Sequence, residues 1–124
     1  MDRSTRATIA VVEDDADVRT ALQQLLRSAG FEAVTFAAAE EFLAYNDKSA
    51  VDCLIADVNL PGMTGVELVK RLRASDTRLP ALLITGRDDP PTVALMSQVG
   101  DVLRLHKPFS DEALFDAIRR VTGR

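Results

Sequence analysis

Five short, mostly apolar runs recur along the chain, and polar or small residues follow each of them. Runs of this length are typical of strands that are covered on both faces of a parallel sheet. We therefore predict strands over residues 8–12, 31–36, 52–56, 80–85 and 101–106.

The segments between and after these runs have apolar residues at helical spacing. Val18, Leu22 and Leu25 lie on one helix face, and Thr64 with Glu67 has the spacing of a capping box. Helices are predicted over residues 18–29, 38–45, 64–75, 90–100 and 110–121. Strands that alternate with helices predict an α/β fold, a doubly wound five-stranded parallel sheet with any ligand site outside the carboxyl ends of its strands.

The composition fits one domain over residues 1–124, because the chain has 124 residues of which 47% are hydrophobic and 27% charged. No apolar run approaches the roughly 20 residues of a membrane helix, and the start has no apolar signal core. We therefore expect a cytoplasmic protein with no membrane partner. A net charge of -4 argues against binding of nucleic acid by this chain alone.

Chemically notable residues follow or close four of the predicted strands: Glu13, Asp14, Asp57, Thr85 and Lys107. Because the carboxyl ends of parallel strands share one edge, we expect the three carboxylates to converge there. Two like charges about 4 Å apart repel by about 4 kcal/mol at an effective dielectric near 20, so a cation is needed. Hard carboxylate oxygens favour Mg²⁺, and Asp57 is the candidate nucleophile for an acyl phosphate.

Each of these residues also has an ordinary structural interpretation. The acids at positions 13–15 could cap the first helix, and Asp57 could be a turn residue. Thr85 could simply end a strand, and Lys107 could lie in a solvated loop. Their joint occurrence at one predicted edge favours a functional site. Cys53, inside a predicted strand, is expected to be a core residue.

Four sequence blocks resemble the receiver domain of two-component response regulators, and within that family the FixJ-like group. They are VVEDD at 11–15, DVNLPGMTG at 57–65, LITG at 83–86 and KPF at 107–109. The resemblance extends over about residues 7–122. It implies a flavodoxin-like (βα)5 fold with strand order 2-1-3-4-5.

The resemblance also implies roles for the residues at the strand ends. Asp57 would be the phosphoacceptor, served by a histidine kinase or a histidine phosphotransfer protein. Asp14 would bind Mg²⁺ (or Mn²⁺) directly, Glu13 through water, and Asn59 through its backbone carbonyl. Thr85 and Lys107 would contact the phosphoryl oxygens. Phosphorylation would remodel the face of the fourth helix, fifth strand and fifth helix, which could bind a downstream protein target or form a homodimer.

The chain departs from the family pattern at Arg104, where receivers commonly have Tyr or Phe as a rotating switch. One interpretation is an exposed arginine on an edge position. The alternative is that Arg104 couples Thr85 to the output face through its charge.

Three functions fit these motifs to different degrees. The first is a stand-alone receiver in a bacterial phosphorelay, which catalyses only its own phosphorylation and dephosphorylation and is not otherwise an enzyme. The second is the N-terminal receiver fragment of a DNA-binding transcriptional regulator. The third, a phosphatase with an aspartyl-phosphate intermediate, is disfavoured because Asn59 stands where such enzymes need a second Asp.

Overall fold

The computed structural model describes residues 6–75, 77–100 and 102–123. Its parallel sheet has the order β2-β1-β3-β4-β5, which confirms the predicted fold class and strand order. The strands are β1 (Thr8–Val12), β2 (Glu32–Phe36), β3 (Cys53–Asp57), β4 (Ala81–Thr85) and β5 (Leu103–His106).

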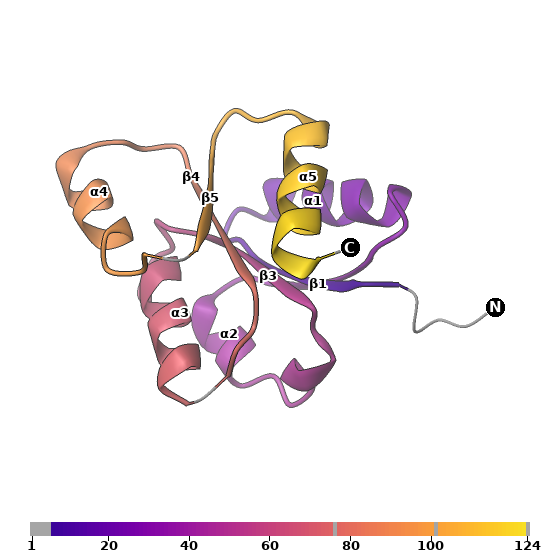
Figure 1. Ribbon diagram of the computed structural model, residues 1–124, viewed down its shortest axis with the longest axis horizontal. Helices are drawn as coiled ribbons and strands as arrows, with labels where there is room; N and C mark the ends of the chain where they lie inside the picture. Colours follow the sequence, from indigo (N-terminus) through magenta and orange to yellow (C-terminus); the bar gives the residue numbers. More distant parts are fainter. Residues whose placement is uncertain (1–5, 76, 101, 124) are drawn as a thin grey trace.

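Helices cover both faces of the sheet (Figure 1). They are α1 (Ala16–Ser28), α2 (Ala39–Leu43), α3 (Gly65–Ala74), α4 (Pro90–Met96) and α5 (Asp111–Thr122), with a 3₁₀ turn, η2, at Lys48–Ala50. One core cluster joins α1 and α5 to the sheet, and a second joins α2, α3 and the end of α4 to the other face. None of the helices in the described ranges is long and apolar enough to cross a membrane.

The central strands are buried on both sides, as their unbroken apolar runs predict. Leu54, Ile55, Leu82 and Leu83 are at most 1% exposed. Burial of one such side chain is worth about 1.5–3 kcal/mol. Cys53 is fully buried in the core as expected, and this burial raises the pKa of its thiol to about 12.

Several predicted boundaries are shifted. Phe31 does not begin β2, because its N–H donates to the carbonyl of Leu26 at 3.0 Å and closes the turn after α1. Gly30 adopts a φ of 93° in that turn, a conformation that favours glycine. Strand β3 lies one residue later than predicted, and β4 begins at Ala81.

The prediction for α4 is wrong at its end, because the helix stops at Met96 and not near Gly100. The N–H groups of Gln98 and Val99 donate to carbonyls three residues back, at 3.1 and 3.3 Å, so the chain tightens beyond the helix. This turn places Val99 in the core at 3% exposure. Strand β5 starts at Leu103, and Asp101, in the predicted strand, lies outside the described residues.

Candidate functional site

The carboxyl ends of four parallel strands bring the predicted site residues to one edge of the sheet. Glu13 directly follows β1 and Lys107 directly follows β5, whereas Asp57 and Thr85 are the last residues of β3 and β4. Asp57 is therefore part of its strand, in register with Ile84, and does not lie in a turn.

Both carboxylate oxygens of Asp57 accept hydrogen bonds. The backbone N–H of Asn59 donates to Oδ1 at 2.8 Å, and the Nζ of Lys107 donates to Oδ2 at 3.1 Å. The Asp57 side chain is 13% exposed. The carboxylate is thus held in one orientation by the main chain and a lysine, and solvent still reaches it.

The Lys107 ammonium pairs with a second carboxylate, since its Nζ lies 3.8 Å from Oε1 of Glu13. Burial alone would lower the pKa of Lys107. The hydrogen bond and charge of Asp57, followed by the charges of Glu13 and Asp14, outweigh burial, so the pKa lies above its ordinary value. Lys107 therefore stays protonated and links two of the predicted acids.

Glu13 is 5% exposed, and its Oε2 accepts the N–H of Asp15 at 3.1 Å. Burial is the main cause of a raised pKa at Glu13, and the charges of Asp57 and Asp14 add to it. The hydrogen bond from Asp15 and the charge of Lys107 act in the opposite direction. Glu13 is thus a buried carboxylate whose negative charge is only partly offset by the N–H of Asp15 and by Lys107.

The three consecutive acids at positions 13–15 have different surroundings. Asp15 caps α1, because its Oδ1 accepts the N–H groups of Asp17 and Val18 at 2.9 and 3.2 Å. Asp14 is exposed. The guanidinium of Arg19 donates to the carbonyl of Glu13 at 2.8 Å and fixes the loop from inside α1. The helix-capping interpretation is therefore correct for Asp15.

Thr85 is buried, at 4% exposure, with its hydroxyl turned toward the loop that follows β4. The hydroxyl donates to the carbonyl of Arg87 at 2.9 Å and accepts the N–H of Arg87 at 3.0 Å. Thr85 thus lies at the predicted edge, and its hydroxyl is hydrogen-bonded to the backbone of Arg87 and not to Asp57.

Glu13, Asp14 and Asp57 lie at one edge of the sheet, and the charge of Glu13 interacts with those of the other two. Within the described ranges, no three His, Cys, Asp or Glu side chains form a group that could hold a metal ion as they stand. Lys107 already pairs with Asp57 and Glu13, the carboxylates that would have to face the ion. The nearby donors are still hard oxygens, of the kind Mg²⁺ prefers.

Helix α3 begins directly against the backbone of Asp57. Thr64 and Glu67 form the predicted capping box, with hydrogen bonds of 3.1 and 3.2 Å. The N–H of Gly65 donates to the carbonyl of Val58 at 3.2 Å, and a Cβ at position 65 would collide with the carbonyl oxygen of Asp57. Only glycine permits this approach, a requirement that sequence reasoning missed.

Arg104 extends from β5 to the end of α4. Its Nη2 donates to the carbonyl of Met96 at 3.0 Å and to that of Val99 at 3.4 Å. A cation at the carboxyl end of a helix also interacts favourably with the helix dipole. Arg104 is exposed, but it is more than a solvated side chain because it ties α4 to β5.

An apolar hollow of about 520 Å³ lies beside Lys107 and was not foreseen from the sequence. Val18 and Leu22 of α1 line it on one side, and Phe109 lines it after β5. The feature that could have indicated this hollow is Val18, which belongs to the apolar stripe of α1 and is partly exposed.

A model of the response regulator receiver domain family matches residues 9–119. The chain is 39% identical over 121 residues to Nodulation protein W of Bradyrhizobium diazoefficiens, covering 98% of this chain and 53% of that protein. It is 39% identical over 111 residues to the transcriptional regulatory protein FixJ of the same organism, covering 90% of this chain and 54% of that protein. The chain thus spans about half the length of these relatives.

Solved structures agree with the sequence matches. The chemotaxis protein CheY4 of Vibrio cholerae superposes with a TM-score of 0.82 at 34% identity, and the match covers 94% of this chain and 99% of that one.

Proposed function

The chain belongs to the family of response regulator receiver domains, and from this premise we propose that Asp57 accepts a phosphoryl group from a phosphohistidine. The donor is a histidine kinase or a histidine phosphotransfer protein. The observation that supports this most is the Asp57 carboxylate at the end of β3, accessible to solvent and hydrogen-bonded to Lys107. Receiver domains are signalling domains, so the output is a changed protein surface.

In the transfer, a carboxylate oxygen of Asp57 forms a bond to phosphorus while the bond from phosphorus to the donor's imidazole nitrogen breaks. The nitrogen leaves with the electron pair. Lys107 stabilises the charge that develops on the phosphoryl oxygens, because its ammonium is already positioned against Asp57. The apolar hollow between α1 and Phe109 is the surface against which the donor protein packs.

Mg²⁺ or Mn²⁺ fits the oxygen donors of this edge. Asp14 would bind the ion directly, Glu13 through water, and Asp57 and the carbonyl of Asn59 would complete the protein's share. Mg²⁺ usually keeps several waters and needs only one or two carboxylates besides phosphate oxygens. When bound, the ion neutralises charge on the carboxylates and the phosphoryl group.

Thr85 and Arg104 connect this site to the face of α4, β5 and α5. A phosphoryl group offers the Thr85 hydroxyl charged acceptors that compete with its present bonds to Arg87. Movement of that loop shifts the start of α4, whereas Arg104 holds the end of α4. The balance between these two attachments sets how this face binds a downstream protein or a second copy of the chain.

The test is phosphorylation by a small acyl phosphate with Mg²⁺, measured by intact mass. The parent gains one phosphoryl group, and Asp57→Asn gains none. Asp52→Asn serves as a control for the loss of a carboxylate, since Asp52 lies at the opposite end of β3, where it accepts the N–H of Thr8 at 2.8 Å. Equal phosphorylation of the parent and Asp57→Asn would refute the proposal.

We propose that residues 1–124 form a single receiver domain that acts alone, and this is supported by the match to 99% of the CheY4 chain. The alternative is the N-terminal receiver of a DNA-binding regulator, which is supported by the match to 54% of the transcriptional regulatory protein FixJ. The length of the encoded open reading frame distinguishes the two.

A further inference from the structure

The loop that follows β4 connects the phosphoacceptor edge to α4. It begins after Thr85, which ends the strand next to that of Asp57, and it reaches Asp89, directly before α4. Both hydrogen bonds of the buried Thr85 hydroxyl are made with the backbone of Arg87. Any change in the direction of this hydroxyl therefore requires that the two bonds to Arg87 break or that the loop moves with it.

An ion pair within the same loop attaches Arg87 at a second point. The Nη2 of Arg87 donates to Oδ2 of Asp89 at 2.8 Å, and the two side chains are 62% and 33% exposed. The backbone of Arg87 is thus bound to Thr85, and its side chain is bound to the residue that precedes α4. These contacts form one continuous connection from the Thr85 hydroxyl to the start of the helix.

An acid directly before a helix ordinarily caps it, but Asp89 does not. Pro90 and Pro91 occupy the first two positions of α4 and have no N–H to donate, and the Asp89 side chain accepts no capping hydrogen bond. The side chain of Thr92, followed by the guanidinium of Arg87, lowers the pKa of Asp89, and burial acts in the opposite direction. Asp89 is therefore a charged carboxylate whose partner in the ion pair is Arg87 and not the helix backbone.

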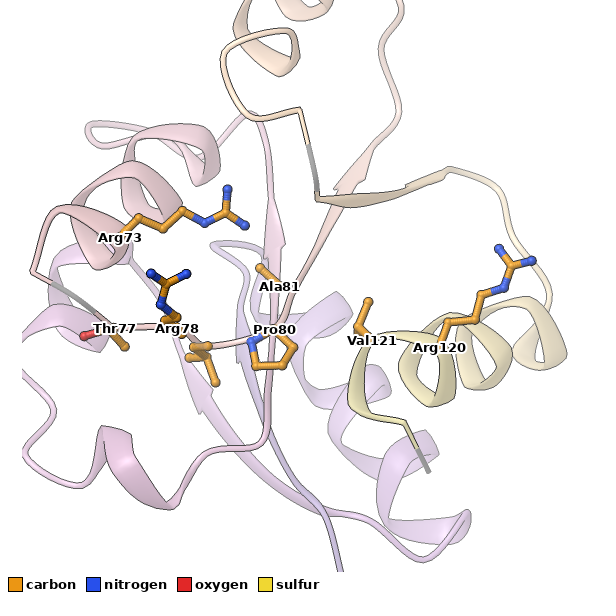
Figure 2. A pocket seen from close by; sticks show the side chains of 8 residues that line it. Arg73, Thr77, Arg78, Pro80, Ala81, Arg120 and Val121 are labelled. Atoms are coloured by element: carbon orange, nitrogen blue, oxygen red, sulfur yellow. The ribbon is translucent and has the colours of Figure 1, made fainter.

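Pairing of this kind is not general among the exposed arginines of the chain. Arg78 and Arg120 form no ion pair with any residue in the described ranges, and Figure 2 shows the Arg120 side chain directed away from Arg78. Arg119 pairs with Asp116 at 2.9 Å, but both residues lie on α5, three positions apart. The pair formed by Arg87 differs because it joins the loop of Thr85 to the start of another element.

We propose that the Arg87–Asp89 ion pair holds this loop in the arrangement that keeps the Thr85 hydroxyl away from Asp57. The proposal rests on the phosphoacceptor role proposed for Asp57. A phosphoryl group on Asp57 attracts the Thr85 hydroxyl, which then releases the backbone of Arg87 and pulls the loop away from the ion pair. The ion pair thus opposes activation of the chain.

The strength of an exposed ion pair limits how large this effect is. Such a pair shifts an equilibrium by at most about fivefold, whereas a full switch from 1:99 to 99:1 takes about 10⁴-fold. The Arg87–Asp89 pair therefore adjusts the balance between the two positions of Thr85 and does not decide it alone.

The test is the binding of beryllofluoride, a stable mimic of a phosphoryl group on a carboxylate, in the presence of Mg²⁺. Amide signals of the ¹⁵N-labelled full chain report the affinity. Arg87→Gln and Asp89→Asn should each tighten binding about two- to fivefold at low salt, because each removes the pair that opposes the movement of Thr85. The double variant should bind no more tightly than either single variant, since both changes break the same interaction.

Two matched controls separate the ion pair from net charge. Arg119→Gln removes the same charge together with an exposed ion pair on α5. Asp88→Asn removes an exposed carboxylate of the same loop that forms no ion pair in the described ranges. Both variants should bind beryllofluoride as the parent does. High salt should reduce the difference between Arg87→Gln and the parent, because salt screens exposed charges.

Loss of positive charge alone would weaken the binding of this anion, so tighter binding by Arg87→Gln has no explanation in net charge. Weaker binding by Arg87→Gln would overturn the proposal, because the guanidinium would then contact the phosphoryl mimic itself. Additive effects of the two single changes would overturn it as well. A parent that binds no beryllofluoride would refute the role of Asp57 and this proposal with it, whereas equal binding by the parent and both single variants would refute the role of the ion pair alone.

Discussion

Two pairs of basic side chains at opposite edges of the sheet differ in whether they have acceptors within the chain. At the carboxyl edge, Lys107 pairs with Asp57 and Glu13, and nearby Arg104 donates to carbonyls at the end of α4. At the amino edge, Arg78 and Arg120 have no ion-pair partner within the described ranges. Where the strands begin, Arg6 pairs with Glu32, so Arg78 and Arg120 differ from Lys107 and Arg104 as individual side chains and not because of the edge at which they lie.

This difference separates two uses of a basic side chain. A cation with internal acceptors orients other groups, so its removal should alter the activity or the stability of the chain itself. A cation without internal acceptors contributes little to folding, because exposed charges are well solvated. The predictions below test this distinction from the largest expected effect to the smallest.

Lys107→Met should slow phosphorylation by a small acyl phosphate about 100-fold, the usual effect of removing one group that stabilises developing charge. Initial rates from intact mass measure it. The control is Lys70→Met, since Lys70 lies exposed on α3, where its Nζ bonds to Gln98 at 2.8 Å. Unchanged rates in Lys107→Met would mean that the ammonium has only a structural role.

Glu13→Gln should weaken Mg²⁺ binding about tenfold, as is common when a group that orients metal ligands is altered. Amide shifts of residues 13–15 and 57–59 during a Mg²⁺ titration report the affinity. Glu32→Gln, an exposed change on β2 where the carboxylate pairs with Arg6, should have no effect. Equal affinities in the parent and Glu13→Gln would remove Glu13 from the metal site.

Arg104→Gln should lower the free energy of unfolding by about 1 kcal/mol, through loss of its hydrogen bonds to the end of α4. Hydrogen exchange should accelerate at the amides of residues 93–99 more than elsewhere. Urea denaturation measures the first effect and exchange mapped by NMR the second. If Arg119→Gln accelerates exchange in α4 equally, the link through Arg104 is incorrect.

Arg78→Gln and Arg120→Gln should each change the free energy of unfolding by less than about 0.5 kcal/mol, the usual range for exposed substitutions. Urea denaturation at low salt is the measurement. A loss as large as that of Arg104→Gln would show that these arginines have internal acceptors, and the contrast between the two pairs would fail.

The fold and the membership of the receiver family were predictable from the sequence. Unbroken apolar runs specify strands buried on both faces, and the spacing of the four motifs specifies the family. The edge at which Asp57 and Lys107 meet follows from parallel topology alone, because every strand ends on the same side.

Features that depend on side-chain orientation could not be predicted. The bonds of Arg104 to carbonyls near the end of α4 have no local sequence pattern. The Thr85 hydroxyl forms a local turn with Arg87, but the sequence does not show whether a threonine makes such a turn or faces a site. The end of α4 was misplaced because helical spacing continues to Val99 although the hydrogen bonds tighten after Met96.

The close approach of Gly65 to Asp57 extends the site to a residue that has no functional group. Because a Cβ there would meet the carbonyl oxygen of Asp57, even the smallest side chain would displace the end of β3 or the start of α3. Such a displacement separates the carboxylate from the N–H of Asn59 and from Lys107 without altering any of the three. The absence of a Cβ at position 65 therefore lets the end of β3 lie against the start of α3. The position of the Asp57 carboxylate depends on this glycine, although glycine has no side chain that could take part in the chemistry.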